Sequence, residues 1–327
     1  MQLTDKHVIE QANAWMQNNK TIWLCTILNT YGSAPRPIGS LFITDGEQRC
    51  GSISGGCLED AFVTMLNNGE FQQSSDIFTY GNHAIEQDIV RELPCGGTIR
   101  LLVECFISNQ ENQHHLTSLL ELANKQQPFT RTINLQQQSK CLNKISGENI
   151  PAIYESTDVV VLAYAQVFSL LLVGIGQVTE HIAQLGLMAG FEVKLCDMRK
   201  ELASSWRFTK ENGGVDVDWM SPDLFVEKYS NKRSAVLALA HDPRIDDPAL
   251  MSVFDTDSFY IGAMGSHKTS ANRSERLQRI CEITPEQLTR LHAPIGLHIG
   301  SKTPVEIAIS TLADIIRVKN GIAKGKV

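Results

Sequence analysis

The sequence has no apolar run long enough to cross a membrane. Its most apolar stretch, DVVVLAYAQVFSLLLVGIG from Asp158, is interrupted by Gln166 and Ser169 and ends in a glycine turn. A helical span needs roughly 20 predominantly apolar residues, so we interpret this stretch as two successive buried strands. The N-terminus, MQLTDKHVIEQANAW, also lacks the basic start and apolar core of a secretory signal. Both absences favour a cytoplasmic protein with no membrane partner.

Paired cysteines are also missing. The eight cysteines include no CxxC motif and no spacing typical of zinc sites. In a reducing cytoplasm, isolated cysteines are mostly buried and behave as small hydrophobes, as we expect for Cys25, Cys105 and Cys196. Cys57 and Cys95 differ, because each lies beside a Gly-Gly pair.

The sequence has fewer basic than acidic residues. The chain has 29 lysines and arginines against 36 aspartates and glutamates, giving a formal net charge of −7. Such an acidic balance disfavours binding to nucleic acid, so we expect no nucleic-acid partner. The length of 327 residues, with 43% hydrophobic residues, suits two globular domains.

The first domain is expected over residues 1–165, with mixed α/β structure. The sequence predicts helices at 6–18 and 116–126, a strand at 21–30, and a hairpin in SLFITDGEQRCGSIS with Asp45-Gly46 at its turn. A further helix is expected to open at Gly56–Cys57. Residues 107–157 are the poorly readable segment, and their polar part from 127 onward shows little apolar periodicity.

The second domain is expected over residues 166–327. Strands there alternate with helices, which predicts a Rossmann-like parallel sheet and an α/β fold class. The last helix, at 304–319, is signalled by the capping box TPVE, with Thr303 at the N-cap and Pro304 at the first helical position.

A glycine turn opens this second domain. Gly174 and Gly176 follow a strand and precede a helix, a context in which the backbone can approach a pyrophosphate. Asp197 closes the next strand, where a ribose-binding carboxylate belongs. The third glycine position is Thr179, which we expect to loosen the packing of helix on strand. The turn either binds NAD(P) or serves only as a scaffold.

Polar groups follow two other strands of the second domain. Gly265, Ser266 and Lys268 open a helix whose Arg273 and Arg276 either converge on phosphate or carboxylate or form a solvated basic face.

His241 and Asp242 lie beyond the end of a strand, on the side where open α/β sheets hold ligands. Asp242 before a proline is also a common turn signal. A lone His292 is more often hydrogen-bonded structure than a ligand.

Two glycine–thiol loops distinguish the first domain. They are GSISGGCLE and LPCGGT, which contain Gly55, Gly56 and Cys57 and then Cys95, Gly96 and Gly97. A cysteine at a helix N-terminus can ionise readily, and a thiolate suits soft metals and sulfur transfer. The alternative is simple packing of a tight turn.

Charged residues flank these loops. Arg36, in SAPRPIG, is a candidate clamp for an anion. Glu59 and Asp60 suit the first turn of a helix, yet they oppose a negatively charged ligand.

The motifs together resemble the XdhC/CoxI family. GSAPRPIGSLFIT, GSISGGCLED and PCGGTIRLLVE resemble its first domain, whereas VGIGQV, AHDPRIDDPAL, IGAMGSHKTSANRSERL and HAPIGLHIGSKTPVEIAISTLADII resemble its Rossmann domain. Cys57 and Cys95 match the family's Gly-Gly-Cys and Cys-Gly-Gly positions. Thr179 and Ser274 depart from the family pattern.

The resemblance implies a maturation factor for molybdenum hydroxylases such as xanthine dehydrogenase or aerobic carbon monoxide dehydrogenase. Such a factor would bind the molybdenum cofactor, present it for sulfuration and deliver it to the apo-enzyme, with Cys57 and Cys95 near the molybdenum. The implied partners are the target dehydrogenase and a cysteine desulfurase, and the implied assembly is a homodimer. The alternatives are an NAD(P)-dependent oxidoreductase or a nucleotide-sensing module that uses the second domain.

Overall fold

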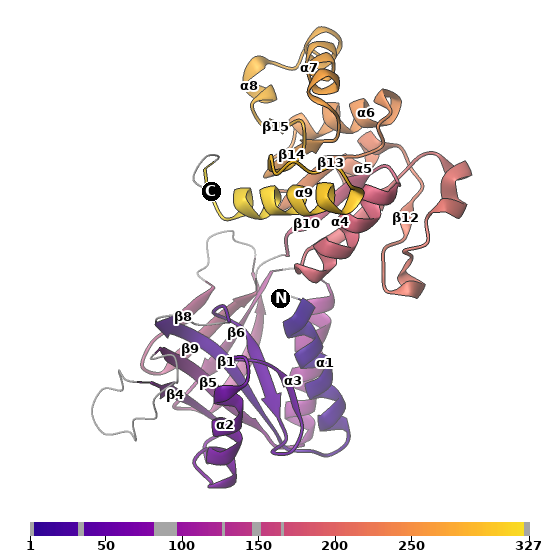
Figure 1. The fold of residues 1–327 in the computed structure, drawn as a ribbon. Helices are drawn as coiled ribbons and strands as arrows, with labels where there is room; N and C mark the ends of the chain where they lie inside the picture. Colours follow the sequence, from indigo (N-terminus) through magenta and orange to yellow (C-terminus); the bar gives the residue numbers. More distant parts are fainter. Residues whose placement is uncertain are drawn as a thin grey trace. The chain divides into compact units, whose positions relative to one another are not determined.

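The computed structural model describes residues 3–31, 36–81, 97–125, 128–145, 152–164 and 167–323. The chain divides into two compact units, Met1–Gln166 and Val167–Val327, whose elements are labelled in Figure 1. Within the described ranges, no helix combines the length and apolar character needed to span a membrane.

The first unit is built on a five-stranded antiparallel sheet. Its strands are β1 (Ile22–Tyr31), β2 (Leu41–Thr44), β3 (Arg49–Gly51), β4 (Ser75–Tyr80) and β5 (Thr98–Phe106). Their order is β3-β2-β1-β5-β4. The central pair runs from Ile22 opposite Phe106 to Tyr31 opposite Thr98. The predicted hairpin around Asp45-Gly46 is confirmed as β2 and β3.

Helices cover both faces of this sheet, so its central strands β1, β2 and β5 are buried along most of their length. The helices are α1 (Leu3–Gln17), α2 (Cys57–Asn67) and α3 (Gln110–Asn124). One face packs against α2 through Phe42 and Phe62. The other packs against α1 and α3 through Leu24, Met16 and Leu116. The predicted opening of a helix at Gly56–Cys57 is confirmed, with Gly56 as the N-cap residue.

A second antiparallel sheet completes the first unit. It contains β6 (Phe129–Asn134), β7 (Ser139–Lys144), β8 (Ile153–Glu155) and β9 (Val159–Tyr164), in the order β7-β6-β9-β8. The segment that was unreadable in the sequence therefore supplies most of a sheet. Only the second of the two predicted buried strands, β10 (Ser169–Val173), is fully buried. Strand β9 is half-buried and belongs to this separate sheet.

A buried ion pair joins the two sheets of the first unit. Arg131 on β6 donates from both terminal nitrogens to the Glu104 carboxylate on β5, at 2.6 Å each, and both side chains are fully buried. Its Nε donates to His115 of α3 at 2.9 Å. Lys140 lies farther off, with its amine 4.0 Å from Glu104. Burial opposes the charge of Arg131, but Glu104 raises the pKa of the guanidinium above its usual value.

The second unit is a six-stranded parallel sheet. Its strands are β10, β11 (Glu192–Cys196), β12 (Val217–Asp218), β13 (Ser234–Ala238), β14 (Tyr260–Ala263) and β15 (Leu291–His292). Their order is β12-β11-β10-β13-β14-β15. The chain reverses direction across the sheet between β10 and β13, where open α/β folds hold ligands.

Helices lie on both sides of the parallel sheet, as the strand–helix alternation predicted. They are α4 (Gln177–Met188), α5 (Pro222–Tyr229), α6 (Pro243–Phe254), α7 (His267–Cys281), α8 (Pro285–Leu288) and α9 (Pro304–Lys319), with the short turns η1 (Lys200–Ser205) and η2 (Lys210–Asn212). Ile182 of α4 and Ile315 of α9 share one core, whereas Phe225 of α5 and Leu250 of α6 belong to the other. The predicted bounds of α9, 304–319, are confirmed, with the capping box at its N-terminus.

His292 is part of a buried polar network. Its Nδ1 lies 2.7 Å from Asp314 on α9, and the Tyr260 hydroxyl donates to the same carboxylate oxygen at 3.0 Å. Arg317 donates to the other oxygen at 2.8 Å. Burial alone would raise the pKa of Asp314, but these partners lower it to about 2. The network ties the edge strand to α9, so the hydrogen-bonded interpretation of His292 is confirmed.

We predict that Arg131→Leu destabilises the first unit by about 3–5 kcal/mol, because it leaves the Glu104 carboxylate buried without its partner. The measurement is the free energy of unfolding from urea titration followed by circular dichroism. Adding Glu104→Leu to this variant should recover part of the loss, since the unpaired buried carboxylate is then removed.

The matched control is Arg100→Leu. Arg100 on β5 pairs with Glu155 on β8 at 2.5 Å, so it also links the two sheets, but its side chain is 39% exposed. An exposed pair contributes about 1 kcal/mol or less. Equal losses in both variants would contradict a special role for the buried pair.

Candidate functional site

The two glycine–thiol loops and the Arg36 loop leave the same edge of the first sheet. Strand β1 ends at Tyr31 opposite the start of β5, and β4 ends at Tyr80 opposite Ile99. Strand β2 begins at this edge, and β3 ends there. The described ends of the connections β1–β2, β3–α2 and β4–β5 therefore all lie at this edge.

Described residues cover only part of this edge. Arg36 is exposed. Cys95 and Gly96 lie outside the described residues, as does the side chain of Cys57. Gly97 is buried, and a Cβ on Gly81 would lie 2.3 Å from its carbonyl oxygen. The two ends of the segment that contains Cys95 are thus in close contact.

The Gly-Gly-Cys loop has an open backbone face. Gly55 and Gly56 have φ values of 87° and 134°, a region that side-chain-bearing residues rarely adopt. A Cβ on either would meet no atom of a described residue within 4 Å. Helix α2 begins at the next residue, Cys57. The loop therefore places two glycines, which have no side chains, directly before the N-terminus of α2.

The inner side of this loop is filled by Glu59. Its carboxylate accepts hydrogen bonds from the backbone N–H groups of Ile53 at 2.9 Å and of Ser54 and Gly56 at 3.0 Å. The hydroxyl of Ser52 donates to it at 2.7 Å, and that of Ser54 donates as well. Glu59 is only 4% exposed. Burial alone would raise the pKa of the carboxyl, but these donors lower it to about 2.

This arrangement changes the interpretation of the loop. The amide groups that could cradle an external anion already bind an internal one, so the loop is no free anion nest. Asp60, the other acid of the first turn, points outward and pairs with Arg49. The Glu at the third helical position was a usable signal, because a side chain there commonly reaches back over the N-cap.

The glycine turn of the second unit lies at the carboxyl edge of the parallel sheet. Gly174 has a φ of 98°, and a Cβ there would lie 2.6 Å from Ala240 beyond β13. Gly176 is the N-cap of α4 and faces open space. The expectation for Thr179 is wrong: it is 1% exposed, and its hydroxyl donates to the Gly174 carbonyl at 2.7 Å. It secures the turn instead of loosening it.

Carboxylates and guanidinium groups pair off along this edge. Asp197 pairs with Arg199 at 2.8 Å, Asp242 with Arg244 at 2.7 Å, and Asp246 with Arg273 at 3.1 Å. Farther along α7, Arg276 pairs with Asp247 at 2.5 Å. Burial raises the pKa of Asp246 to about 6 despite its partners.

The pairs settle two open expectations. Arg273 and Arg276 do converge on carboxylates, but on those of the protein itself. Asp242 is the N-cap of α6 and accepts from the Arg244 amide at 2.9 Å, so it starts a helix that the sequence pattern did not predict.

Three predicted residues with polar side chains are exposed at this edge, besides the backbone of Gly176. The three are His241, Ser266 and Lys268. Gly265, between β14 and α7, is half-buried, and Ser266 caps α7 by accepting from Thr269 N at 3.1 Å. Burial lowers the pKa of His241, and the nearby Arg273 lowers it further. The open polar groups are therefore few.

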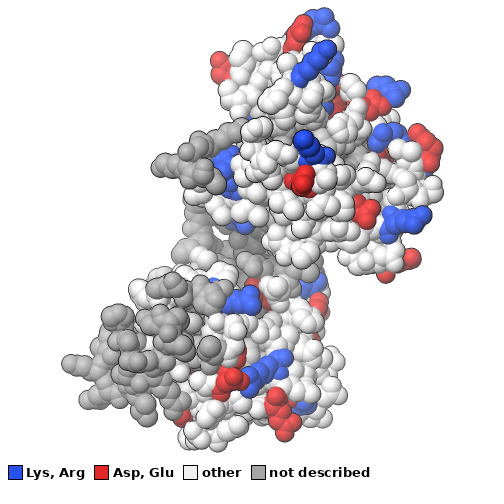
Figure 2. Space-filling view, viewed as in Figure 1, with Lys and Arg blue, Asp and Glu red and all other residues white. Residues whose placement is uncertain are grey.

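The remaining surface offers weaker candidates. Of the cysteines expected to be buried, Cys25 and Cys196 are buried, whereas Cys105 is only partly so. Among the described residues, no three His, Cys, Asp or Glu side chains are grouped to hold a metal ion. On the face shown in Figure 2, basic and acidic residues are interspersed.

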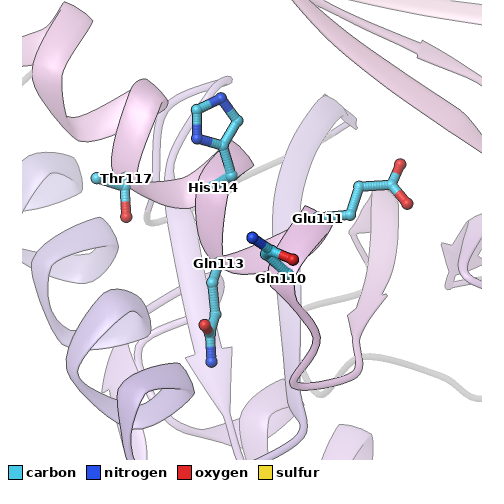
Figure 3. A pocket seen from close by; sticks show the side chains of 5 residues that line it. All are labelled: Gln110, Glu111, Gln113, His114 and Thr117. Atoms are coloured by element: carbon cyan, nitrogen blue, oxygen red, sulfur yellow. The ribbon is translucent and has the colours of Figure 1, made fainter.

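A hollow on α3 contains none of the predicted site residues. Figure 3 shows its lining side chains, which all come from one helix and point in different directions. They are Gln110, Glu111, Gln113, His114 and Thr117. Because no second element contributes to this hollow, we assign no site there.

Fold and site together define a two-unit α/β protein with a Rossmann-like second unit. The XdhC Rossmann domain family matches residues 170–315, and the XdhC and CoxI family matches residues 15–81. The chain belongs to the XdhC/CoxI family, as the sequence motifs predicted.

Individual relatives agree with this assignment. A protein named molybdenum cofactor insertion chaperone PaoD, from Escherichia coli, is 26% identical over 97% of this chain and 90% of its own length. A protein named as a probable xanthine dehydrogenase subunit, from Bacillus subtilis, is 23% identical over 95% of this chain and 97% of its own. The crystal structure of a protein described as a xanthine dehydrogenase, from Bacillus halodurans, has a TM-score of 0.74 at 20% identity and covers 99% of this chain and 98% of that one. This last match confirms the fold.

We predict that Glu59→Gln opens the Gly-Gly-Cys loop. The amide has one acceptor oxygen in place of a carboxylate that serves five donors, and each hydrogen bond to a charged group is worth about 1.5–3 kcal/mol. Hydrogen exchange at the amides of Ile53, Ser54 and Gly56 should accelerate at least tenfold, which corresponds to about 1.4 kcal/mol. Asp60→Asn is the control, because it removes the outward acid of the same helical turn and should leave these rates unchanged.

The wild-type loop should also respond to acid. The folded-state pKa of Glu59 lies below its unfolded value, so its stabilisation is present above about pH 4.5 and is lost as the pH falls toward 2. Exchange protection of the three amides, corrected for intrinsic rates, should fall over that range in wild type but not in Glu59→Gln. Equal acid responses in both proteins would contradict the assignment.

Proposed function

We propose that this protein is a maturation factor that binds the molybdenum cofactor as cargo and delivers it to a molybdenum hydroxylase. The observation that carries the proposal is the end-to-end similarity to a protein named molybdenum cofactor insertion chaperone. The similarity to a probable xanthine dehydrogenase subunit supports a client of that class, either a xanthine dehydrogenase or an aerobic carbon monoxide dehydrogenase.

The chemistry of the first-unit edge suits such a cargo. Cys57 begins a helix directly after two glycines whose outer faces are open, so a bulky ligand can approach the backbone there. Thiolates are suitable ligands for soft metals. Arg36, on the neighbouring loop, offers a guanidinium for the phosphate of the pterin. We propose that Cys57 and Cys95 contact the molybdenum centre.

Glu59 limits how the cargo is held. Because its carboxylate occupies the loop amides, the loop cannot hold the pterin phosphate through them. Recognition at this edge therefore depends on sulfur, on Arg36 and on contact with the open glycine faces. In the second unit, the exposed His241, Ser266 and Lys268 are candidates for binding an anion.

The finer parts of the proposal concern assembly and sulfur. The protein would act as a cytoplasmic homodimer with separate domains at residues 1–165 and 166–327, and a cysteine desulfurase would supply sulfur to the bound cofactor. The proposed set of cofactor-binding residues is Arg36, Gly55, Gly56, Cys57, Cys95, Gly96, Gly97, Gly174, Gly176, His241, Asp242, Gly265, Ser266 and Lys268. Asp197, predicted together with them, is left out of the proposal because Arg199 and the Ile175 amide already occupy its carboxylate.

The test is anaerobic purification of the full chain from a host that makes the cofactor. We expect wild type to carry molybdenum and to release a fluorescent pterin on oxidation. Cys57→Ser should lose most of the molybdenum, because a hydroxyl is a hard, poor ligand for a soft metal. Both quantities are measured per mole of protein.

Cys141→Ser is the matched control, because Cys141 is an exposed cysteine of the same unit on β7 and should not affect loading. Wild-type protein that carries neither metal nor pterin, even with cofactor in excess, would overturn the cargo proposal. If Cys57→Ser carries as much molybdenum as wild type, Cys57 does not contact the metal and only packs in the turn.

A further inference from the structure

To bind NAD(P), the turn Gly174–Gly176 and the strand after it would have to supply two kinds of hydrogen-bonding group. Backbone N–H groups of such a turn approach the pyrophosphate, and a carboxylate at the end of the second strand accepts hydrogen bonds from the adenosine ribose. The corresponding groups in this chain are the Ile175 amide and Asp197.

The Asp197 carboxylate is fully engaged within the protein. One oxygen accepts from the Arg199 amide at 2.9 Å and from Arg199 Nε at 3.0 Å. The other accepts from Arg199 Nη2 and from the Ile175 amide, both at 2.8 Å. An ionised carboxylate has about four lone-pair positions, so none is left for a ribose hydroxyl. Asp197 is also completely buried.

The same contacts occupy the turn. Ile175 N–H points inward to Asp197, so it does not offer itself to a pyrophosphate. Releasing Asp197 for a ribose would require Arg199 to move away, and releasing Ile175 would cost the carboxylate another donor. Each change leaves a buried polar group without its partner, which is strongly unfavourable.

We infer that the second unit does not bind NAD(H) or NADP(H). Arg199 and the Ile175 amide already occupy every hydrogen-bond acceptor position of Asp197, the carboxylate that would bind the adenosine ribose. A ligand of this edge must bind without a diol contact on Asp197. NADP(H) is excluded for a related reason. Its 2′-phosphate could pair fully with Arg199 only if the guanidinium moved away from Asp197. This inference is independent of the proposed cargo role.

The test is equilibrium binding of NADH and NADPH to the full-length protein, followed by nicotinamide fluorescence and by the shift in melting temperature. Wild type should show no saturable response at millimolar nucleotide. Arg199→Ala frees the two positions on Asp197 that the guanidinium occupies, whereas the backbone N–H of residue 199 still donates to the carboxylate. We therefore expect the variant to bind NADH at least about tenfold more tightly, the effect of one hydrogen bond to a charged group. The melting temperature without ligand reports whether the variant is folded.

Arg244→Ala is the matched control. Arg244 forms the same fork with an aspartate two residues earlier, Asp242 at the start of α6, but Asp242 is not bonded to the glycine turn. This variant should behave as wild type. Arg199→Lys keeps the charge without the fork, and it should show intermediate NADH binding even if Arg199→Ala fails to fold.

Two results would overturn the inference. One is saturable binding of NADH or NADPH by wild type that is weakened in Asp197→Asn or Arg199→Ala. The other is a folded Arg199→Ala or Arg199→Lys protein that still binds no NADH, because Arg199 would then not be the group that excludes it.

Discussion

A buried carboxylate closes each of the two glycine-rich turns from within. Glu59 gathers the amides of Ile53, Ser54 and Gly56, and Asp197 holds the amide of Ile175. Without these acids, several backbone N–H groups would face inward with no acceptor, which is costly in a protein interior. The turns are therefore complete before any ligand arrives. Their shape does not depend on an external anion, and the elements that follow them, α2 and α4, start from fixed positions.

Because each turn is closed by its own carboxylate, the two units differ in which groups stay accessible to a ligand. In the first unit, the glycines of the closed turn have no described residue over their outer faces. In the second unit, Gly174 is packed against Ala240, and the arginines around the turn are paired with aspartates. The positions of the carboxylates are the basis for both proposals, cargo binding at the first unit and exclusion of NAD(P) from the Rossmann turn.

Local signals explain which parts of the fold were predictable. The capping box at Thr303 and the Asp45-Gly46 turn are encoded within a few residues, and both elements form as expected. Strands β6, β7 and β8 were missed because their burial depends on distant partners. Arg131 reads as a surface residue in a polar segment, and it is buried only because Glu104 lies opposite it on another sheet. No local pattern contains that contact.

The candidate site was harder to predict because one residue pattern serves two purposes. An acid at the end of the second strand marks a ribose site, yet the same position can close the turn. What distinguishes the two is Arg199, two residues later, whose backbone and guanidinium both return to Asp197. Glu59 likewise occupies the third helical position, from which its carboxylate reaches back to Gly56, whereas Asp60 points outward. In both turns the spacing between acid and backbone decides whether the anion comes from the protein or from a ligand.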